Sequence, residues 1–317
     1  MEKEIMPWKK NINGENQYYY KPYKSKTKQI QQDWLKEHGY KRNTFPPQFF
    51  ENIEEQLTPG QLGYWAYAID GDGCINRRLD GKNKELSVVI SLTDPEPVQE
   101  LADIYGTSIS RTKFLTESWA TVCRTKLSGK RALHFLRLIC PYMTEKRKKA
   151  TQAINMFDPN YHPPKIQMNF RQNPELLNPH MGMVGGFFDT EGSVGIAIRE
   201  QKRMTKKLGE RYSRFLDPWV KFDNTDIRPI RKLKKLLETW PFTFKPVLST
   251  YRQKNKISNG KKQKILYTLN IPQPQHLLFM KMFSPFILIT RKREYADKFE
   301  LKKRIYKMCD ENKMVRK

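Results

Sequence analysis

The sequence has few cysteines and no long apolar segment. Its four cysteines form no C-x-x-C pair, and its five histidines are scattered. In a chain of this length we therefore expect reduced thiols, with neither a disulfide framework nor a structural zinc site. No segment approaches the ~20 consecutive apolar residues that a membrane-spanning helix needs. The opening residues, MEKEIMPWKKNING, contain no apolar core of a secretory signal, so we expect an intracellular protein.

Acidic residues are also scarce relative to basic ones. The 317 residues include 59 Lys and Arg but 33 Asp and Glu, which gives a formal net charge of +26. Such an excess, spread along the chain, favours a polyanionic partner, because neutralising a phosphate backbone releases its condensed counterions. The sequence shows no long basic amphipathic helix with an apolar face, so a membrane surface is disfavoured as that partner. The length allows one large or two medium domains.

A short acidic motif occurs twice in the chain. AIDGDGCI (68–75) and FFDTEGSV (187–194) each end an apolar segment with two acids, one residue apart, followed by glycine. Helix-start signals precede both segments, with Thr58 as N-cap of the first helix and Asn178 as N-cap of the second. We expect each helix to end at the first acid, with glycines letting the chain turn into a strand.

The motif belongs to a larger internal repeat. After each helix, apolar residues alternate along a strand: Leu86, Val88, Ile90 and Leu92 in the first copy, Val220 and Phe222 in the second. A helix, two further strands and a final helix follow in both copies, and Asn259-Gly260 signals a hairpin turn in the second. The predicted fold class is α+β, built from two α-β-β-α-β-β-α half-domains related by a pseudo-twofold axis.

The repeat sets the predicted domain boundaries. Residues 1–57 form a basic and aromatic N-terminal extension, and residues 58–157 form the first half-domain. Residues 158–177 are a polar linker, and residues 178–317 form the second half-domain with a basic tail.

Two acids at a helix C-terminus are electrostatically unfavourable, because that end already carries partial negative charge. A hard divalent cation binds oxygen ligands and is attracted by the same potential. If the two helix ends meet, their carboxylates can hold metal for phosphodiester cleavage, in which metals activate water and stabilise the reacting oxygens. We expect the small residues Ala66, Gly185 and Gly186 to let the helices approach. A single motif of this kind is more often a turn or helix end, but two copies in matched contexts favour a site.

The segments WAYAIDGDG (65–73) and VGGFFDTEG (184–192) resemble the motif of the LAGLIDADG homing endonucleases. The resemblance extends over roughly residues 58 to 305 and is to the single-chain type with two motifs. It implies two motif helices packed at the centre and two saddle-shaped antiparallel sheets on the DNA. It also implies magnesium-dependent double-strand cleavage at a long, specific site, with Asp72 and Glu191 as catalytic acids sharing two or more Mg²⁺ ions.

The same resemblance suggests further residues. Asp70 and Asp189 fall at a structural position, and Lys126 at the place of a basic catalytic residue, with Asn270 as its repeat partner. Asn224 keeps an amide that would hold a metal-bound water, where the first copy has Leu92. The family usually has a small residue where this chain has Tyr67, so the first helix is expected to pack with large and small positions exchanged.

Basic residues recur on the predicted strands of both copies. In STYRQKNK (249–256), cations alternate with neutral hydrogen-bonding residues, which suits base edges and phosphates. Any one of these residues has about even odds of being merely solvated, but the whole set agrees with the net charge. The predicted DNA-binding residues are Arg77, Arg78, Lys82, Lys84, Arg111, Lys113, Arg124, Arg199, Lys202, Arg203, Arg211, Arg214, Lys221, Arg252, Lys254 and Lys256.

These features predict a monomeric, site-specific DNA endonuclease that makes a double-strand break at an asymmetric target of about two helical turns. Its biological setting would be the mobility of an intron or intein. Two alternatives remain: an RNA maturase that helps an intron fold on the same scaffold, and a DNA-binding regulator without catalysis. Retention of both Asp72 and Glu191 disfavours the regulator and leaves the maturase open.

Overall fold

The computed structural model describes residues 8–12, 15–19, 45, 47–80, 83–112, 121–164, 171–205, 209–251 and 265–301. Side chains are described within these ranges except at 8–12, 15–19, 83, 112, 198–205, 209–215 and 251. Within this part of the chain, no helix has both the length and the apolar character needed to cross a membrane.

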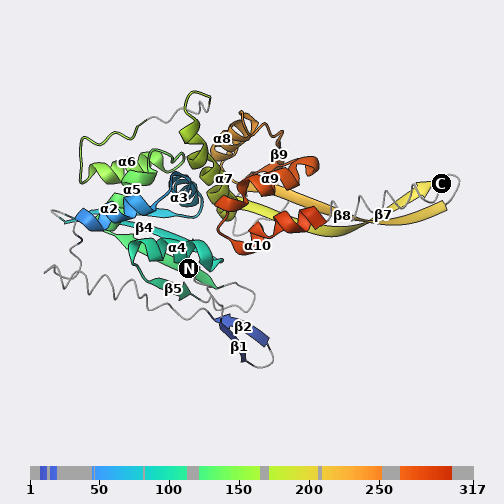
Figure 1. Cartoon of the computed structure of the whole chain (residues 1–317), viewed down its shortest axis with the longest axis horizontal. Coiled ribbons are helices and arrows are strands. Elements are labelled where there is room, and N and C mark those ends of the chain that lie inside the picture. Colours follow the sequence, from blue (N-terminus) through green and yellow to red (C-terminus); the bar gives the residue numbers. More distant parts are fainter. Residues whose placement is uncertain are drawn as a thin grey trace, which may run out of the picture.

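Two half-domains with the predicted order of elements make up the body of the molecule (Figure 1). The first half consists of α3 (Pro59–Gly71), β3 (Cys74–Asp80), β4 (Asn83–Leu92), α4 (Pro95–Tyr105), β5 (Ile109–Thr112), β6 (Val122–Ser128), α5 (Lys130–Ile139) and α6 (Arg147–Asn155). The second half consists of α7 (Leu177–Glu191), β7 (Gly192–Thr205), β8 (Gly209–Asn224), α8 (Ile227–Glu238), β9 (Val247–Tyr251), β10 (Leu266–Asn270), α9 (His276–Phe283) and α10 (Thr290–Arg293).

Each half contains one four-stranded antiparallel sheet. The strand orders are β3-β4-β6-β5 and β7-β8-β10-β9, so the two sheets have the same topology. The α+β fold and its duplication are thereby confirmed. The two halves have different arms, because β7 and β8 run for 14 and 16 residues and project from the body in Figure 1, whereas β3 and β4 have 7 and 10.

Each half has its own hydrophobic core between its sheet and its helices. The predicted strand residues Val88, Ile90, Val220 and Phe222 are all buried there, as their alternation indicated. Tyr67 is an exception to the division, because it lies on α3 of the first half yet packs in the core of the second. The Tyr67 ring contacts the Phe187 ring edge to face. This large side chain, at a position where a small residue was expected, therefore links the two hydrophobic cores.

Among the residues that the structure describes, four elements lie outside the predicted repeat. A hairpin is formed by β1 (Trp8–Ile12) and β2 (Glu15–Tyr19), and α2 (Pro47–Gln56) precedes the first motif helix. Ile53 of α2 and the following Leu57 are buried in the first core, so the end of the predicted N-terminal extension packs as part of the first half. A short 3₁₀ turn, η1 (Pro174–Leu176), leads into α7.

The helix boundaries confirm one sequence prediction and correct two. Thr58 and Gln61 form the capping box at the start of α3. Asn178 is not an N-cap, because α7 begins one residue earlier, directly from η1. The glycine after the second motif is needed for space rather than for an unusual backbone angle: φ of Gly192 is −87°, and a Cβ there would lie 2.3 Å from the Phe188 ring.

Candidate active site

The two motif helices touch along their backbones. A Cβ on Gly63 would lie 1.8 Å from the carbonyl oxygen of Pro179, and one on Gly182 would lie 1.8 Å from that of Gly60. A Cβ on Gly186 would lie 2.1 Å from another carbonyl oxygen of α3, that of Tyr64. Side chains larger than hydrogen would force α3 and α7 apart at these positions.

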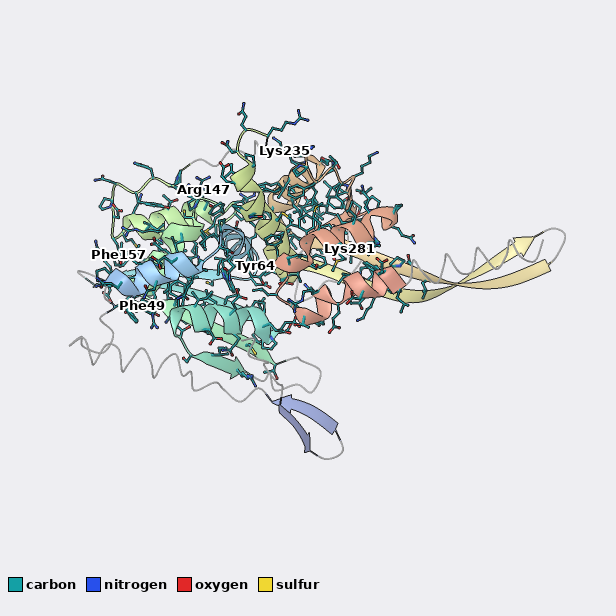
Figure 2. The ribbon with its side chains drawn as sticks, viewed as in Figure 1. Phe49, Tyr64, Arg147, Phe157, Lys235 and Lys281 are labelled. Carbon is teal, nitrogen blue, oxygen red and sulfur yellow. The ribbon has the colours of Figure 1, made fainter. Side chains whose placement is uncertain are left out.

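The residues that make this contact differ from those expected. Gly186 does face α3, but Ala66 is buried in the core of the first half and Gly185 faces the backbone of Phe286. Figure 2 shows Tyr64 at the centre of the molecule, where the halves meet, and its hydroxyl donates a hydrogen bond to Asp189 across the interface at 2.9 Å.

Close packing brings the acidic ends of the two helices together. A Cβ on Gly71 would lie 2.5 Å from Thr190 Oγ1 and 3.5 Å from Glu191 Oε1. Burial and the negative charge of Asp72 raise the pKa of Glu191 to about 7. Asp72 is an exposed residue, yet partial burial of its carboxylate raises its pKa too, against the lowering effect of two nearby lysines. The two predicted catalytic acids therefore lie within electrostatic reach of one another.

The first acid of each motif has a structural role, as predicted. Asp70 accepts hydrogen bonds from the backbone N–H groups of Thr144, Glu145 and Lys146, at 2.6, 3.3 and 2.8 Å. Asp189 likewise accepts the backbone N–H groups of two residues ahead of α10, at 2.7 and 3.2 Å. Each of these carboxylates thus fixes a second segment of chain beside the end of its motif helix.

The segments fixed in this way carry two lysines that sequence reasoning missed. Lys146 Nζ donates to the carbonyl oxygens of Ile69, Gly71 and Gly73, at 2.7, 2.8 and 2.6 Å. A positive charge here compensates the negative end of α3. Because an ammonium has three N–H donors, all of its donors are used.

Lys292 occupies the same place in the second half. Its Nζ donates to the carbonyl oxygens of Phe188, Asp189 and Gly192, at 2.7, 2.8 and 2.8 Å. Burial lowers its pKa to about 8, although nearby acids favour the charged form. Burial also lowers the pKa of Lys146, against the charges of Asp70 and Asp72.

The two other predicted catalytic residues lie on the sheets. Lys126 on β6 is exposed and pairs with Val89, which pairs in turn with Cys74, so two strand spacings of ~5 Å separate it from the end of the first motif. Its repeat partner Asn270 pairs with Lys221, as the repeat predicts. Asn224 ends β8, and its amide oxygen accepts the backbone N–H of Asp226. For both Lys126 and Asn224 the catalytic role stays a prediction.

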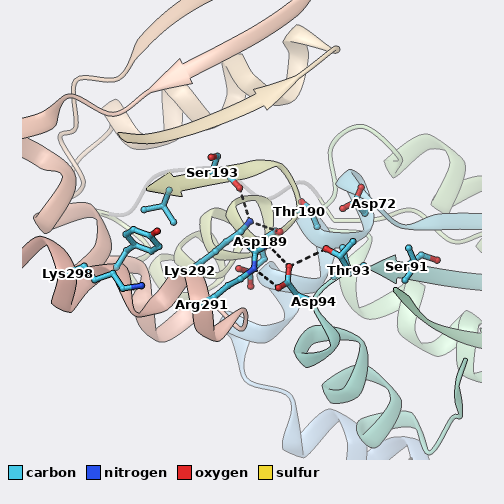
Figure 3. Close-up of a pocket in the computed structure, with 15 residues that line it drawn as sticks. Asp72, Ser91, Thr93, Asp94, Asp189, Thr190, Ser193, Arg291, Lys292 and Lys298 are labelled. Atoms are coloured by element: carbon cyan, nitrogen blue, oxygen red, sulfur yellow. Dashed lines mark hydrogen bonds and ion pairs between the residues drawn. The ribbon is translucent and has the colours of Figure 1, made fainter. Parts of the chain in front are cut away.

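A cavity of about 610 Å³ lies on one side of the paired helix ends and is lined by both halves. Figure 3 shows Arg291 of α10 and Asp94 of the first half pointing toward one another across it, with Lys292 beside Arg291. Asp72 lines the same cavity, together with the hydroxyl groups of Ser91, Thr93, Thr190 and Ser193.

The ligand groups fit a magnesium ion whose coordination shell is completed by substrate and water. They do not fit a metal ion that is coordinated by protein side chains alone. Among the described residues, no group of three or more His, Cys, Asp or Glu side chains is arranged to hold a metal. Asp72 and Glu191 supply two carboxylates whose mutual repulsion a divalent cation would relieve. Magnesium in phosphoryl-transfer sites typically has one or two carboxylate ligands, and substrate phosphates and water complete its shell.

The strand register sorts the predicted DNA-binding residues of the first sheet onto two faces. Arg124 pairs with Ser91, and Arg78 lies in the alternating set of Cys74 and Asn76, so both are on the face that the helices leave open. Three others alternate with this set and lie on the helix side: Arg77, Lys84 and Arg111. Lys84 donates there to the carbonyl oxygen of Met156, after α6.

In the second sheet, Lys221 is on the open face, paired with Ser193 and Asn270, and its ammonium lies 2.8 Å from Asp223. The long arm extends this face, because the register puts three arginines of β7 and β8 in the same alternating set: Arg199, Arg203 and Arg211. Lys202 and Arg214 belong to the opposite set. Five predicted residues lie outside the described residues: Lys82, Lys113, Arg252, Lys254 and Lys256.

No family model and no curated protein matches the sequence. Among solved structures, the chain is similar to the LAGLIDADG meganuclease I-AabMI bound to uncleaved DNA, at 14% identity and a TM-score of 0.47, over 80% of this chain and 92% of that one. It is also similar to I-SmaMI bound to an uncleaved DNA target with calcium ions, at 14% identity and a TM-score of 0.42, over 81% and 93%.

A third similarity, to the homing endonuclease I-CvuI in complex with its target, has 18% identity and a TM-score of 0.25, over 32% of this chain and 69% of that one. These scores are too low to decide anything about this chain, so the family resemblance rests on its own features. In its two packed motif helices, their paired acids and its duplicated α-β-β-α-β-β-α topology, the chain resembles the LAGLIDADG homing endonucleases.

Proposed function

We propose that this protein is a site-specific, metal-dependent endonuclease that cuts both strands of double-stranded DNA. The observation that carries the proposal is the meeting of two acidic helix ends, where burial and the charge of Asp72 raise the pKa of Glu191. Two carboxylates in mutual repulsion are a cost to folding unless a cation binds between them. One chain supplies both acids, so a monomer suffices for the reaction.

The residues of the site have distinct roles in this proposal. Asp72 and Glu191 hold Mg²⁺, which supplies activation of water and stabilisation of the attacking and leaving oxygens. Lys146 and Lys292 have all their N–H donors on backbone carbonyls, so they act through charge and by fixing the helix ends. Asp70 and Asp189 hold the segments that carry these lysines.

The two sheets supply the binding surface. Arg124, Lys126 and Lys221 lie on their open faces. Two sheets that follow the major groove should cover about two helical turns, on the order of 20 base pairs. The target should not be a palindrome, because the sheets differ: Lys221 stands where the first half has Val89, and the second arm is much longer.

Cleavage of a randomised double-stranded DNA library tests the proposal. The full chain is incubated with the library and Mg²⁺, and the ends produced are sequenced. A single recurrent, non-palindromic site of about two helical turns is expected. A parallel reaction with a chelator should give no ends. Cleavage at unrelated sequences, or no cleavage with Mg²⁺, would contradict the proposal.

A further inference from the structure

Two ion pairs join the halves directly beside Lys146 and Lys292. In the first, Arg291 Nε and Nη2 donate to the two carboxylate oxygens of Asp94, at 2.6 and 2.7 Å (Figure 3). Asp94 is the N-cap residue of α4 in the first half, and Arg291 directly precedes Lys292. The bidentate contact therefore links the start of α4 to the segment that holds the end of α7.

The second ion pair lies at the equivalent place, with the roles of the two halves exchanged. Arg228 Nη2 lies 2.6 Å from Glu145 Oε2. Glu145 directly precedes Lys146 in the first half, and Arg228 lies in the first turn of α8 in the second half. In both halves, the residue before the lysine thus binds the start of the equivalent helix of the other half.

The charges of the two pairs are reversed. The residue before the lysine is an acid in the first half, Glu145, and a base in the second, Arg291. The two links are therefore chemically different, and each can be broken or inverted without altering the other.

Stability alone does not account for these contacts. The arginine side chains are 66% and 72% exposed, whereas the acids are 15% and 16% exposed. Solvent-exposed ion pairs contribute little to the free energy of unfolding, and the arginine of each of these pairs is exposed. Their effect is on geometry: each lysine contacts the motif helix of its own half while its neighbour in sequence is fixed to the other half.

We propose that Asp94, Arg291, Glu145 and Arg228 are positioning residues that keep the two half-sites assembled at the same time, so that both strands are cut in one binding event. The proposal rests on the proposed endonuclease function. Without the contact between Arg291 and Asp94, α10 loses its ion pair to the first half, and only the apolar contacts of the preceding segment with that half remain. Lys292 is then held less tightly at the end of α7, beside Glu191, while Lys146 stays in place.

Strand-resolved cleavage of a supercoiled plasmid tests the proposal, with the site recovered from the library as insert. Arg291→Met and Glu145→Gln each remove one link while keeping side-chain bulk. Each variant should accumulate nicked circle, with the ratio of nicked to linear DNA raised about 10-fold, because small misplacements of reacting groups are costly. The slow strand should differ between the two variants, and DNA binding should be unchanged.

Two further variants separate positioning from general destabilisation. Arg137→Met breaks an ion pair with Asp158 that lies within the first half, and should leave the nicked-to-linear ratio at the wild-type value. The double variant Asp94→Arg with Arg291→Asp inverts the first link and should restore most of the double-strand cleavage.

The proposal is overturned if neither single variant accumulates nicked circle, if both variants slow both strands equally, or if the inverted pair gives no recovery. If the wild-type protein cuts no DNA at all, the proposed function fails, and this inference fails with it. A wild-type protein that cuts normally beside unaffected variants refutes the positioning role alone.

Discussion

Adding one methyl group between the motif helices, in Gly186→Ala, should disable cleavage while leaving the protein folded. The new Cβ would lie 2.1 Å from the carbonyl oxygen of Tyr64, which is backbone and cannot rotate away. Carbon–oxygen contacts of about 3.3 Å are the closest normally found, so α3 and α7 must part by roughly 1 Å at this point. Glu191 lies five residues along α7, about 7.5 Å from the contact.

The expected magnitude follows from this displacement. A misplacement of ~1 Å in an active site costs on the order of 100-fold in rate. The free energy of unfolding should fall by about 2 kcal/mol or less, because overpacking costs ~1–3 kcal/mol and the better helix propensity of alanine returns ~1 kcal/mol. Binding depends on the sheets and should change far less than the rate of cleavage.

Gly60→Ala is the matched control. Gly60 lies in the same helix interface, but its new Cβ would meet the ring edge of Phe286 at 2.6 Å, a side chain that can move. The assay compares single-turnover cleavage, DNA binding and thermal unfolding of both variants with the wild type. If Gly186→Ala cleaves at the wild-type rate, or if Gly60→Ala loses as much activity, helix spacing does not set the geometry of the acids.

Three further predictions test other parts of the structure. Tyr67→Ala should lower the free energy of unfolding by about 3–5 kcal/mol in chemical denaturation, because a fully buried ring of the first half leaves the core of the second; a loss below about 1 kcal/mol would contradict this packing. DNA binding should weaken steeply with salt, and Lys126→Ala should reduce the slope of log K against log salt by ~0.9 if it contacts phosphate, whereas Lys84→Ala, on the helix side, should not change it. The pKa of Asp226 is lowered to about 2 by its hydrogen bond from Arg228, so its contribution to stability is present above its ordinary pKa and is lost as the pH falls toward 2; thermal unfolding of Asp226→Asn should show a smaller loss over that range than the wild type.

The repeat and the buried strand positions could be predicted because they depend on local periodicity. Val88 and Ile90 alternate with polar residues, and only one register buries both. The capping box of Thr58 and Gln61 is equally local. The start of α7 was misjudged because Asn178 and Pro179 form a good capping pattern, but the turn at Pro174 already brings the chain into a helical conformation.

The helix contact and the lysines could not be predicted, because they depend on how distant segments meet. Glycines 63 and 182 are needed only because of the angle and depth at which α3 and α7 cross. Lys146 and Lys292 have no local signal among 59 basic residues. What could have indicated them is their place shortly after Pro141 and Pro285, which the repeat aligns.

The face of a sheet on which a basic residue lies could not be predicted from the sequence either. Arg77 and Arg78 are adjacent in sequence, and composition alone assigned both to the DNA-binding surface. Pairing with Leu86 and Glu85 separates them, because side chains alternate across a sheet. A basic residue on a strand therefore indicates a nucleic-acid contact only once the register is known.

Cleavage by variants of the paired acids tests the central claim most directly. Asp72→Asn and Glu191→Gln each remove one charge and one strong metal ligand while keeping shape. Each variant, and the control Asp158→Asn at a half-buried acid that follows α6 and pairs with Arg137, is incubated with Mg²⁺ and plasmid carrying the recovered site. Supercoiled, nicked and linear forms are quantified beside a binding assay.

Both acid variants should lose linearisation, and both should bind the site at least as tightly as the wild type, because two carboxylates beside phosphates are repulsive without metal. The control should cut normally. A variant that linearises its target at the wild-type rate would remove that acid from the active site. If both variants did so, the two acidic helix ends would be helix termini and nothing more.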